Sequence, residues 1–172
     1  SFRKYLAMTK YLVPIVLLVI MPLQNSLAQQ NLSPCSGSEY STLDFWVGEW
    51  NAVWEGGSGT NQITRDYNGC VIREDFRGSN LKGMSISSYV KPEGKWRQIW
   101  VDEQNGFLDL SGIKDGDKYI FHTTPNPEKP EVQLRMVFSD ILKDSFTWTW
   151  QGTTDGGKNW ETRWQINYIR AK

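Results

Sequence analysis

Hydrophobic and polar residues alternate along most of the chain beyond residue 42, and a turn-forming break interrupts the alternation about every ten to twelve residues. The breaks contain dipeptides such as Asn68-Gly69, Asn105-Gly106 and Asp115-Gly116, which are frequent in tight turns. Alternation with a period of two predicts strands, and no helical period separates them. We therefore predict an all-β fold with ten strands, at residues 43–54, 60–67, 70–76, 83–90, 95–103, 107–113, 118–124, 131–139, 146–152 and 159–170.

The connections between these strands are too short for a crossover helix, so neighbouring strands are expected to run antiparallel. With an even number of strands in up-and-down order, the last strand can pair with the first and close a barrel. Closure places Arg170 beside Trp50, where the guanidinium group can stack on the indole. The alternation also predicts that the last strand has one common side for Trp160, Trp164, Ile166, Tyr168 and Arg170.

Residues 1–28 have the pattern of a secretory signal peptide. The pattern consists of a basic start, an apolar run and a small-x-small cleavage step, at residues 3–10, 12–23 and 26–28. The apolar run is shorter than the roughly 20 residues that cross a bilayer, which disfavours the alternative of a retained membrane anchor. We expect residues 29–172 to form a single domain of a secreted or periplasmic protein.

The charge balance narrows the classes of partner. The full chain has 19 basic and 19 acidic residues, and removal of residues 1–28 takes away Arg3, Lys4 and Lys10 but no acidic residue. The remaining 16 basic against 19 acidic residues give a net charge of about −3. Nucleic acids and anionic membranes are bound through basic surface, so we expect neither as a partner. The single His and the two Cys have no metal-ligand spacing, and we predict no metal and no cofactor.

The two cysteines, Cys35 and Cys70, are predicted to form a disulfide, because an exported chain folds under oxidising conditions. The alternative is a pair of unpaired, buried thiols. The Asn68-Gly69 turn puts Cys70 at the end of the barrel where the first strand begins, and the leader that contains Cys35 enters there too. The disulfide would therefore hold a short N-terminal plug across that end.

The chain holds nine Trp, all of them beyond residue 28. Aromatic walls suit apolar or sugar-like ligands, and a charge inside a barrel must be paired or must meet a ligand. Several charged residues lie in the middle of predicted strands, where the alternative is a side chain that faces solvent. We predict a cavity whose ligand-binding residues are Glu74, Gln98, Trp100, Asp102, Arg135 and Trp148.

The sequence also resembles known barrels. Gly48-x-Trp50 on the first strand, together with Arg170 on the last, resembles the structural signature of the calycins, the superfamily of lipocalins and fatty-acid-binding proteins. The resemblance implies a calycin-like barrel in which these three residues are structural. Ten strands with a plug also resemble nitrobindin-type barrels, which hold haem through a His near the C-terminus. Residues 161–172 contain no His, so the resemblance does not imply haem binding here.

A second resemblance covers nearly all of residues 29–172. The segments 43–50, 69–74, 96–102 and 155–160 are similar to a family of uncharacterised, mostly bacterial exported domains. This resemblance implies a calycin-like barrel but no established activity. Segment 154–160 also resembles a single Asp-box, a stable hairpin turn with a Trp beneath it.

Three functions fit these patterns. The first is a binding module that holds a small apolar or amphipathic ligand inside the barrel. The second is a barrel enzyme in which Glu74 or Asp102 acts as a general base and Arg135 stabilises an anion. The third is an interaction or structural domain whose Trp side chains fill the core. We favour the binding module, because the chain lacks the residue sets of nucleophilic catalysis and of phosphate binding.

Overall fold

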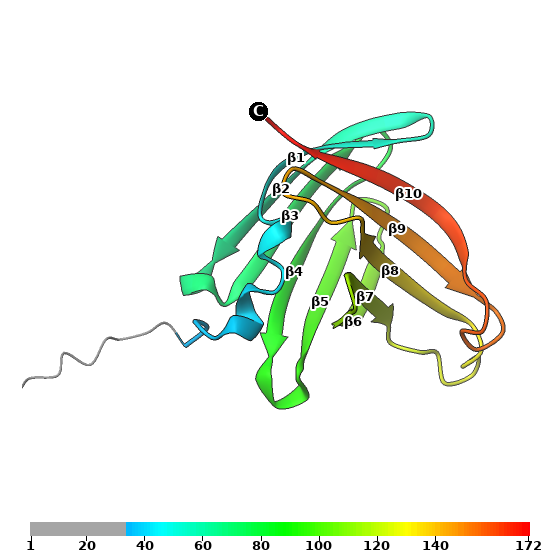
Figure 1. Cartoon of the computed structure of the whole chain (residues 1–172). Coiled ribbons are helices and arrows are strands. Elements are labelled where there is room, and N and C mark those ends of the chain that lie inside the picture. The colour runs from blue at the N-terminus through cyan, green and yellow to red at the C-terminus, as the bar shows by residue number, and fades with distance from the viewer. Residues whose placement is uncertain (1–33) are drawn as a thin grey trace, which may run out of the picture. The chain divides into compact units, whose positions relative to one another are not determined.

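The structure is a computed structural model that describes residues 34–172, so the predicted signal peptide, residues 1–28, lies outside the described residues. Ten antiparallel strands form one closed barrel, as predicted (Figure 1). They are β1 (Gly48–Trp54), β2 (Gly57–Asp66), β3 (Val71–Gly78), β4 (Lys82–Val90), β5 (Lys95–Asp102), β6 (Phe107–Asp115), β7 (Lys118–Thr123), β8 (Gln133–Ser139), β9 (Ser145–Thr153) and β10 (Glu161–Arg170).

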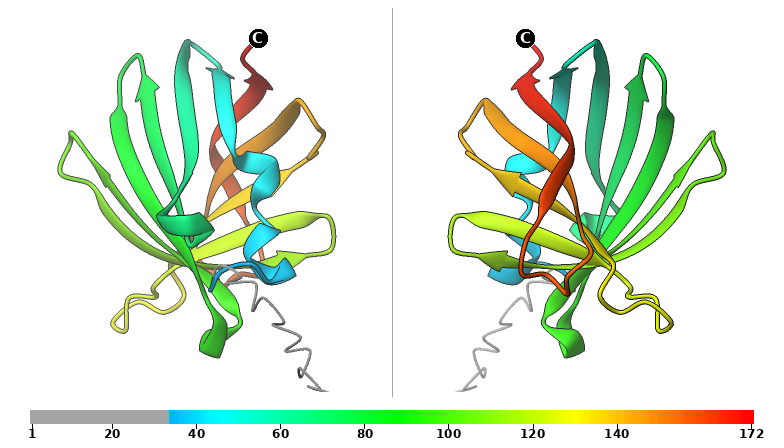
Figure 2. Two further views of the ribbon diagram at one scale, coloured as in Figure 1. Left: turned by 90° about the vertical axis from the view of Figure 1, so that its left-hand side faces the viewer. Right: turned by 90° about the vertical axis from the view of Figure 1, so that its right-hand side faces the viewer.

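Each strand pairs with its neighbours in the sequence, and β10 pairs with β1 to close the ring. The closing register pairs Trp50 with Arg170 and Ala52 with Tyr168. Both views in Figure 2 show β1 and β10 side by side. The predicted juxtaposition of the chain's first and last strands is thus confirmed.

The Arg170 side chain joins the two closing strands. Its guanidinium carbon lies 4.1 Å from the centre of the Trp50 ring. Its Nη1 donates to the backbone oxygen of Val47 at 3.1 Å. Gly48 has a φ of +140°, and a Cβ atom at this position would lie 2.2 Å from Arg170 Nη1. Glycine is therefore required at position 48 both by its backbone conformation and by the close approach of the arginine.

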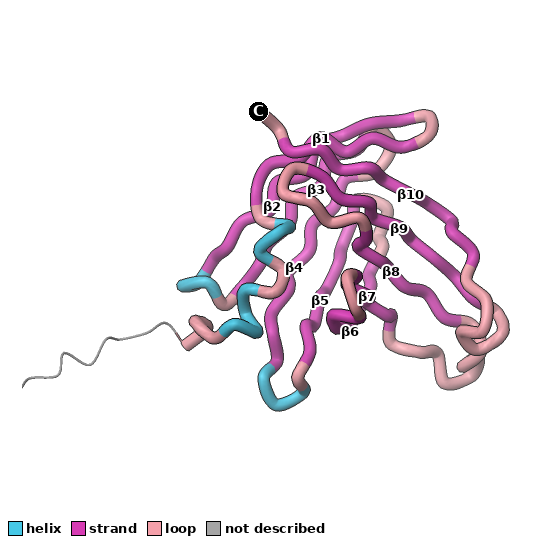
Figure 3. The backbone as a smooth tube through the Cα atoms, viewed as in Figure 1, coloured by secondary structure: helices cyan, strands magenta, loops and turns pink. Residues whose placement is uncertain are grey.

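The first predicted strand, 43–54, begins later than expected, at Gly48. Residues Asp44–Trp46 instead form the short 3₁₀ turn η2, one of the helical turns at this end of the barrel (Figure 3). The backbone oxygen of Trp46 accepts a hydrogen bond from the Trp50 indole at 2.8 Å, and the ring of Phe45 stacks on Tyr119 at 5.1 Å. Leu43 and Trp46 are buried in the barrel end, and the chain forms this turn instead of a longer first strand. Within residues 34–172, no helix is long and apolar enough to cross a membrane.

The last strand departs from the predicted alternation. A β-bulge between Thr162 and Trp164 inserts one residue, so Trp160 does not share the side of Trp164 as predicted. The Trp160 ring instead packs against Arg135, whose guanidinium carbon lies 3.9 Å from its centre, and against His122. From Trp164 onward the predicted alternation holds, and Ile166 and Tyr168 are buried.

The predicted disulfide between Cys35 and Cys70 is present, with 5.1 Å between the Cα atoms. It joins the leader to the short helical turn η3 (Tyr67–Gly69) and the start of β3. Arg65, at the end of β2, reinforces this connection, because its side chain donates to the backbone oxygens of Tyr40 and Gly69. The leader is thus attached to the barrel end by both covalent and polar contacts.

Candidate functional site

A cavity of about 350 Å³ lies inside the barrel. Leu81 and Gly106, from the β3–β4 and β5–β6 connections, line it, so it lies toward the end of the barrel that carries these turns. Trp46 of η2 reaches it from the opposite end. The lining is predominantly apolar and comprises Trp46, Glu74, Phe76, Leu81, Gln98, Trp100, Asp102, Gly106, Leu108, Leu110, Leu134, Met136, Trp148, Trp150, Trp164, Ile166 and Tyr168.

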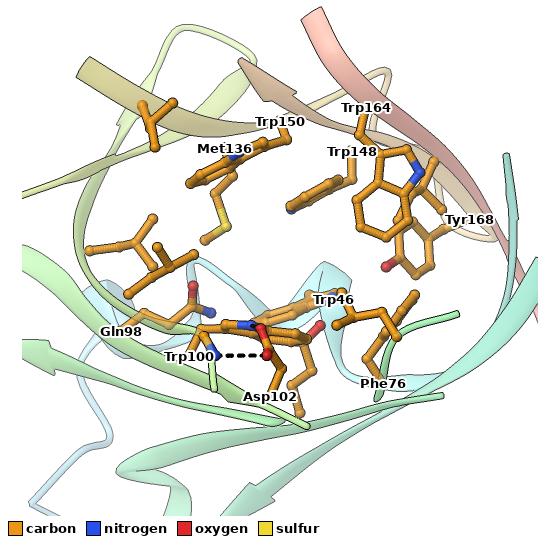
Figure 4. A pocket seen from close by; sticks show the side chains of 17 residues that line it. Trp46, Phe76, Gln98, Trp100, Asp102, Met136, Trp148, Trp150, Trp164 and Tyr168 are labelled. Atoms are coloured by element: carbon orange, nitrogen blue, oxygen red, sulfur yellow. Dashed lines mark hydrogen bonds between the residues drawn. The ribbon is translucent and has the colours of Figure 1, made fainter. Parts of the chain in front are cut away.

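Indole rings form much of the wall. Trp148 and Trp150, two residues apart on β9, stack nearly parallel with their ring centres 6.3 Å apart. Trp164 of β10 meets Trp148 edge to face at 5.6 Å. Figure 4 shows these three rings on one side of the cavity and Trp100 and Trp46 on the other, with open space between them. The open space is therefore faced by aromatic surface from two directions.

Glu74 of β3 provides a carboxyl group in this apolar environment, with only 8% of the residue exposed. One oxygen accepts from Asn61 Nδ2 at 2.7 Å and the other from the Ser85 hydroxyl at 2.6 Å. Burial raises the pKa of Glu74, and the hydrogen bonds from Ser85 and Asn61 oppose this rise. Glu74 is therefore held in place by neutral donors from the two adjacent strands.

Gln98 and Tyr168 extend this polar group. The Gln98 amide nitrogen donates to the hydroxyls of Ser85 at 3.1 Å and Ser87 at 3.0 Å. The Tyr168 hydroxyl accepts from Asn61 Nδ2 at 3.3 Å. Burial, and next the negative charge of Glu74, raise the pKa of Tyr168 far above its ordinary value, so its hydroxyl stays neutral. Both side chains line the cavity, which gives the apolar chamber one polar region.

Asp102 has a different setting, at the rim. One carboxylate oxygen accepts from the Trp100 indole at 2.8 Å, and the other accepts from the backbone nitrogens of Gln104 and Gly106, both at 2.9 Å. The hydrogen bond from Trp100 lowers the pKa of Asp102, and the backbone hydrogen bonds add to this effect against partial burial. Asp102 thus fixes the β5–β6 turn and the orientation of the Trp100 ring.

Of the six predicted ligand-binding residues, five lie on the cavity wall: Glu74, Gln98, Trp100, Asp102 and Trp148. The placement of Arg135 in the cavity is wrong. Leu134 and Met136, its neighbours on β8, line the cavity, so Arg135 faces the outside of the barrel. There its Nε donates to Gln151 Oε1 at 2.7 Å while its guanidinium group covers Trp160.

Several wall residues were absent from the sequence-based prediction. Trp150 and Trp164 could have been found, because Trp150 shares a strand face with Trp148, and Trp164 belongs to the predicted face of the last strand. Trp46 reaches the cavity from a 3₁₀ turn, which alternation does not reveal. Ser85 lies directly opposite Glu74 on β4, and Asn61 reaches it diagonally from β2, and nothing local in the sequence marks these contacts.

Metal ligands do not gather in the part of the chain that the structure describes: no three His, Cys, Asp or Glu side chains lie close enough together to hold an ion. Of the two carboxyl groups among the described cavity-lining residues, Glu74 lies deep in the wall, and Asp102 lies at the rim, where it accepts from the Trp100 indole. The absence of a metal and of a cofactor stays a prediction.

Comparison with known proteins gives little further information. No protein-family model matches the chain, and no curated protein matches it. A crystal structure from Nostoc punctiforme PCC 73102, a protein of unknown function from the DUF3598 family, is similar with a TM-score of 0.46 and 15% sequence identity. The match covers 75% of this chain and 49% of that one, so the chain spans about half the length of this neighbour. The description of the protein therefore rests on its own architecture, which is a closed ten-stranded antiparallel barrel with a chamber lined largely by indole rings.

Proposed function

We propose that this protein is a binding module that encloses one small, largely apolar ligand inside the barrel. The observation that carries the proposal is the cavity of about 350 Å³, which is lined mainly by aromatic and aliphatic side chains and has one buried polar region. Ligand sites commonly combine these features, because apolar walls supply binding energy and a few placed polar groups supply orientation. The aromatic rings favour a flat or ring-containing ligand over a long flexible chain.

A barrel with a purely structural role would be expected to fill its interior, since protein cores pack to the density of organic crystals. Here Trp148, Trp150 and Trp164 pack on one another yet leave open space between themselves and Trp100. This favours the binding module over the interaction domain with a filled core.

The enzyme alternative has less support than the sequence suggested. Arg135 lies outside the cavity and is not placed to stabilise an anion there. The lowered pKa of Asp102, caused first by the Trp100 hydrogen bond, makes this carboxylate a weak base. Glu74 keeps a raised pKa in a cavity, as general acids often do, but each of its oxygens already accepts a hydrogen bond, from Asn61 or Ser85, which favours a fixed acceptor over a proton donor.

The same proposal includes an exported location, a calycin-like relationship and a signal peptide. An exported protein, secreted or periplasmic, is consistent with the disulfide between Cys35 and Cys70, because such bonds persist in oxidising compartments. A calycin-like relationship is supported by Gly48, Trp50 and Arg170, which meet at the barrel closure as the resemblance implies. A signal peptide at residues 1–28 completes this proposal.

The test uses the neutral fluorescent dye N-phenyl-1-naphthylamine, whose emission rises in apolar surroundings. We expect saturable binding of about one dye per barrel, read from dye emission and from quenching of the tryptophans. Leu108→Trp, which enlarges a side chain on the cavity wall, should weaken binding at least ~10-fold while far-UV circular dichroism stays unchanged.

The matched control is Trp160→Phe, which alters an indole that packs outside the barrel on Arg135. It should leave dye binding within about twofold, since the ring does not contact the cavity. Equal binding by the wild type and Leu108→Trp would exclude the cavity as the binding site.

A further inference from the structure

The charged residues of the cavity all have the same sign. Among the described side chains that line it, Glu74 and Asp102 are acidic, and none is Lys, Arg or His. Arg135, the arginine that was predicted to line the cavity, faces outward, and Arg97 on β5 also faces outward, where it pairs with Asp109 at 2.8 Å. The chamber therefore offers a carboxylate ligand no cationic partner.

The polar region consists mainly of acceptors that can face a ligand, and the neutral hydroxyl of Tyr168 adds one donor. The donors of Asn61 and Ser85 are directed at Glu74, which leaves the carboxyl group with further lone pairs and no cation beside it. The Gln98 amide nitrogen is used by Ser85 and Ser87, and Figure 4 shows the Gln98 side-chain oxygen turned toward the open space. Gln98 is only 3% exposed. A ligand that enters this region meets oxygen atoms that can accept, on side chains that are held in position.

The aromatic wall also favours a positively charged ligand. The face of an indole ring carries partial negative charge and attracts cations, and sites for quaternary ammonium groups are typically built from several such faces. Trp46, Trp100, Trp148, Trp150 and Trp164 all line this cavity, and Tyr168 joins them next to Glu74. Both the indole faces and the acceptor cluster favour positive charge on the ligand.

We propose that the ligand of this cavity is a small organic cation, a protonated amine or a quaternary ammonium compound, whose charged group lies against the indole faces beside Glu74. This inference rests on the proposed binding function and names the ligand class for the same site. It departs from the anionic lipids that a likeness to fatty-acid-binding proteins would suggest. The ligand's charge would compensate the buried carboxylate, which has no other cation to pair with.

Pairing of the ligand cation with Glu74 links ligand binding to the protonation state of the Glu74 carboxyl group. The groups that face Glu74 are Asn61 from β2, Ser85 from β4 and Tyr168 from β10, and of these only Tyr168 titrates, far above neutral pH. Asp102 lies at the rim, where its partners hold it ionised. A cation that binds near Glu74 stabilises the carboxylate form, so any proton on Glu74 leaves to solvent. Affinity for the cation should therefore rise with pH, whereas that for a neutral ligand should not.

The experiment compares three probes of similar size as competitors of the bound neutral dye: benzyltrimethylammonium, its uncharged isostere neopentylbenzene, and the anion 3-phenylpropanoate. We expect benzyltrimethylammonium to compete ~10-fold better than neopentylbenzene, in line with a desolvated cation–π site beside a carboxylate, and 3-phenylpropanoate to compete worst. Glu74→Gln should remove most of the cation's advantage over its uncharged isostere, and also the pH dependence of that advantage.

Asp75→Asn is the matched control, because it removes one negative charge from the neighbouring position on the outer face of β3. It should leave the advantage of the cation unchanged. If the dye binds but the cation competes no better than its isostere, or if Glu74→Gln and Asp75→Asn behave alike, the cation inference is overturned and the binding module stands. If the dye does not bind either, the proposed function fails first.

Discussion

Mutagenesis can isolate one contact at the closure of the barrel, the approach of Arg170 to Gly48. Replacement of Arg170 by Ala removes the stack on Trp50, worth about 0.5–2 kcal/mol. It also removes the hydrogen bonds to Val47 and to the backbone oxygen of Lys143, at 3.1 Å each from the two Nη atoms. The side chain is 31% exposed and its partner Asp144 is 65% exposed, so that ion pair adds little. We expect a loss of about 3 kcal/mol in the free energy of unfolding.

Gly48→Ala should act partly through the same arginine. The new Cβ atom would lie 2.2 Å from Arg170 Nη1, so the guanidinium group must move away. The φ of +140° adds backbone strain of about 1–3 kcal/mol, because this region is nearly restricted to glycine. We expect a total of about 4 kcal/mol for this variant.

The double variant separates the two contributions. Without the arginine, the Gly48→Ala substitution retains only the backbone strain, so we expect a loss of about 5 kcal/mol rather than the roughly 7 kcal/mol of independent effects. The coupling of about 2 kcal/mol would be measured by urea denaturation of the four proteins, followed by tryptophan fluorescence and far-UV circular dichroism.

A surface arginine provides the control for this cycle. Arg77→Ala removes a side chain that is 65% exposed, and it should change stability by less than about 0.5 kcal/mol. If the losses of Gly48→Ala and Arg170→Ala were simply additive, the claim that glycine is needed to admit the arginine would be refuted.

Three further predictions concern the disulfide, the buried carboxyl group and the β9–β10 turn. Replacement of Cys35 and Cys70 by Ala should lower the free energy of unfolding by about 4 kcal/mol, because 35 positions separate the linked residues; an unchanged urea midpoint would contradict this. Glu74 has a folded-state pKa above its ordinary 4.5, so stability should fall as the pH rises above about 4.5 toward that pKa. In Glu74→Gln this fall should be smaller, and it would be measured as the difference between the urea midpoints at pH 4 and 7. Asp155→Ala should speed amide hydrogen exchange at Lys158 and Asn159, whose nitrogens donate to Asp155, and unchanged protection there would show that the carboxylate does not hold the turn.

The barrel was predictable because its pattern is local and repetitive. Strands such as β4 and β6 were placed to within two residues, since alternation and turn dipeptides both lie in the nearby sequence. The shift of the first strand's start was not predictable. Residues 43–47 carry strong strand-forming side chains, but Leu43, Phe45 and Trp46 bury more apolar surface by folding into the barrel end.

The candidate site was predictable only where the alternation of residues along a strand shows which of them point into the barrel. Gln98, Trp100 and Asp102 share a face of β5, and all three reach the cavity. Arg135 was misplaced because a single charged residue on β8 does not indicate which face is inside. Its neighbours Leu134 and Met136 are the better guide, since they supply the apolar side of the strand.

The sequence by itself determined the class of fold, the number of strands, the pairing of the chain's two ends and the partner of each cysteine. These follow from periodicity, chain connectivity and the expected export of the chain, and they require no knowledge of side-chain contacts between distant strands. Only the tertiary structure decided which charges lie inside, because each depends on a register, a bulge or a cross-strand partner. The bulge at Thr162 and Trp164 directs Trp160 away from the face it was expected to share, and strand pairing brings Asn61 and Ser85 onto Glu74. An acidic, indole-walled chamber without a basic residue among its described lining is thus a property of the assembled barrel, which no single stretch of the chain encodes.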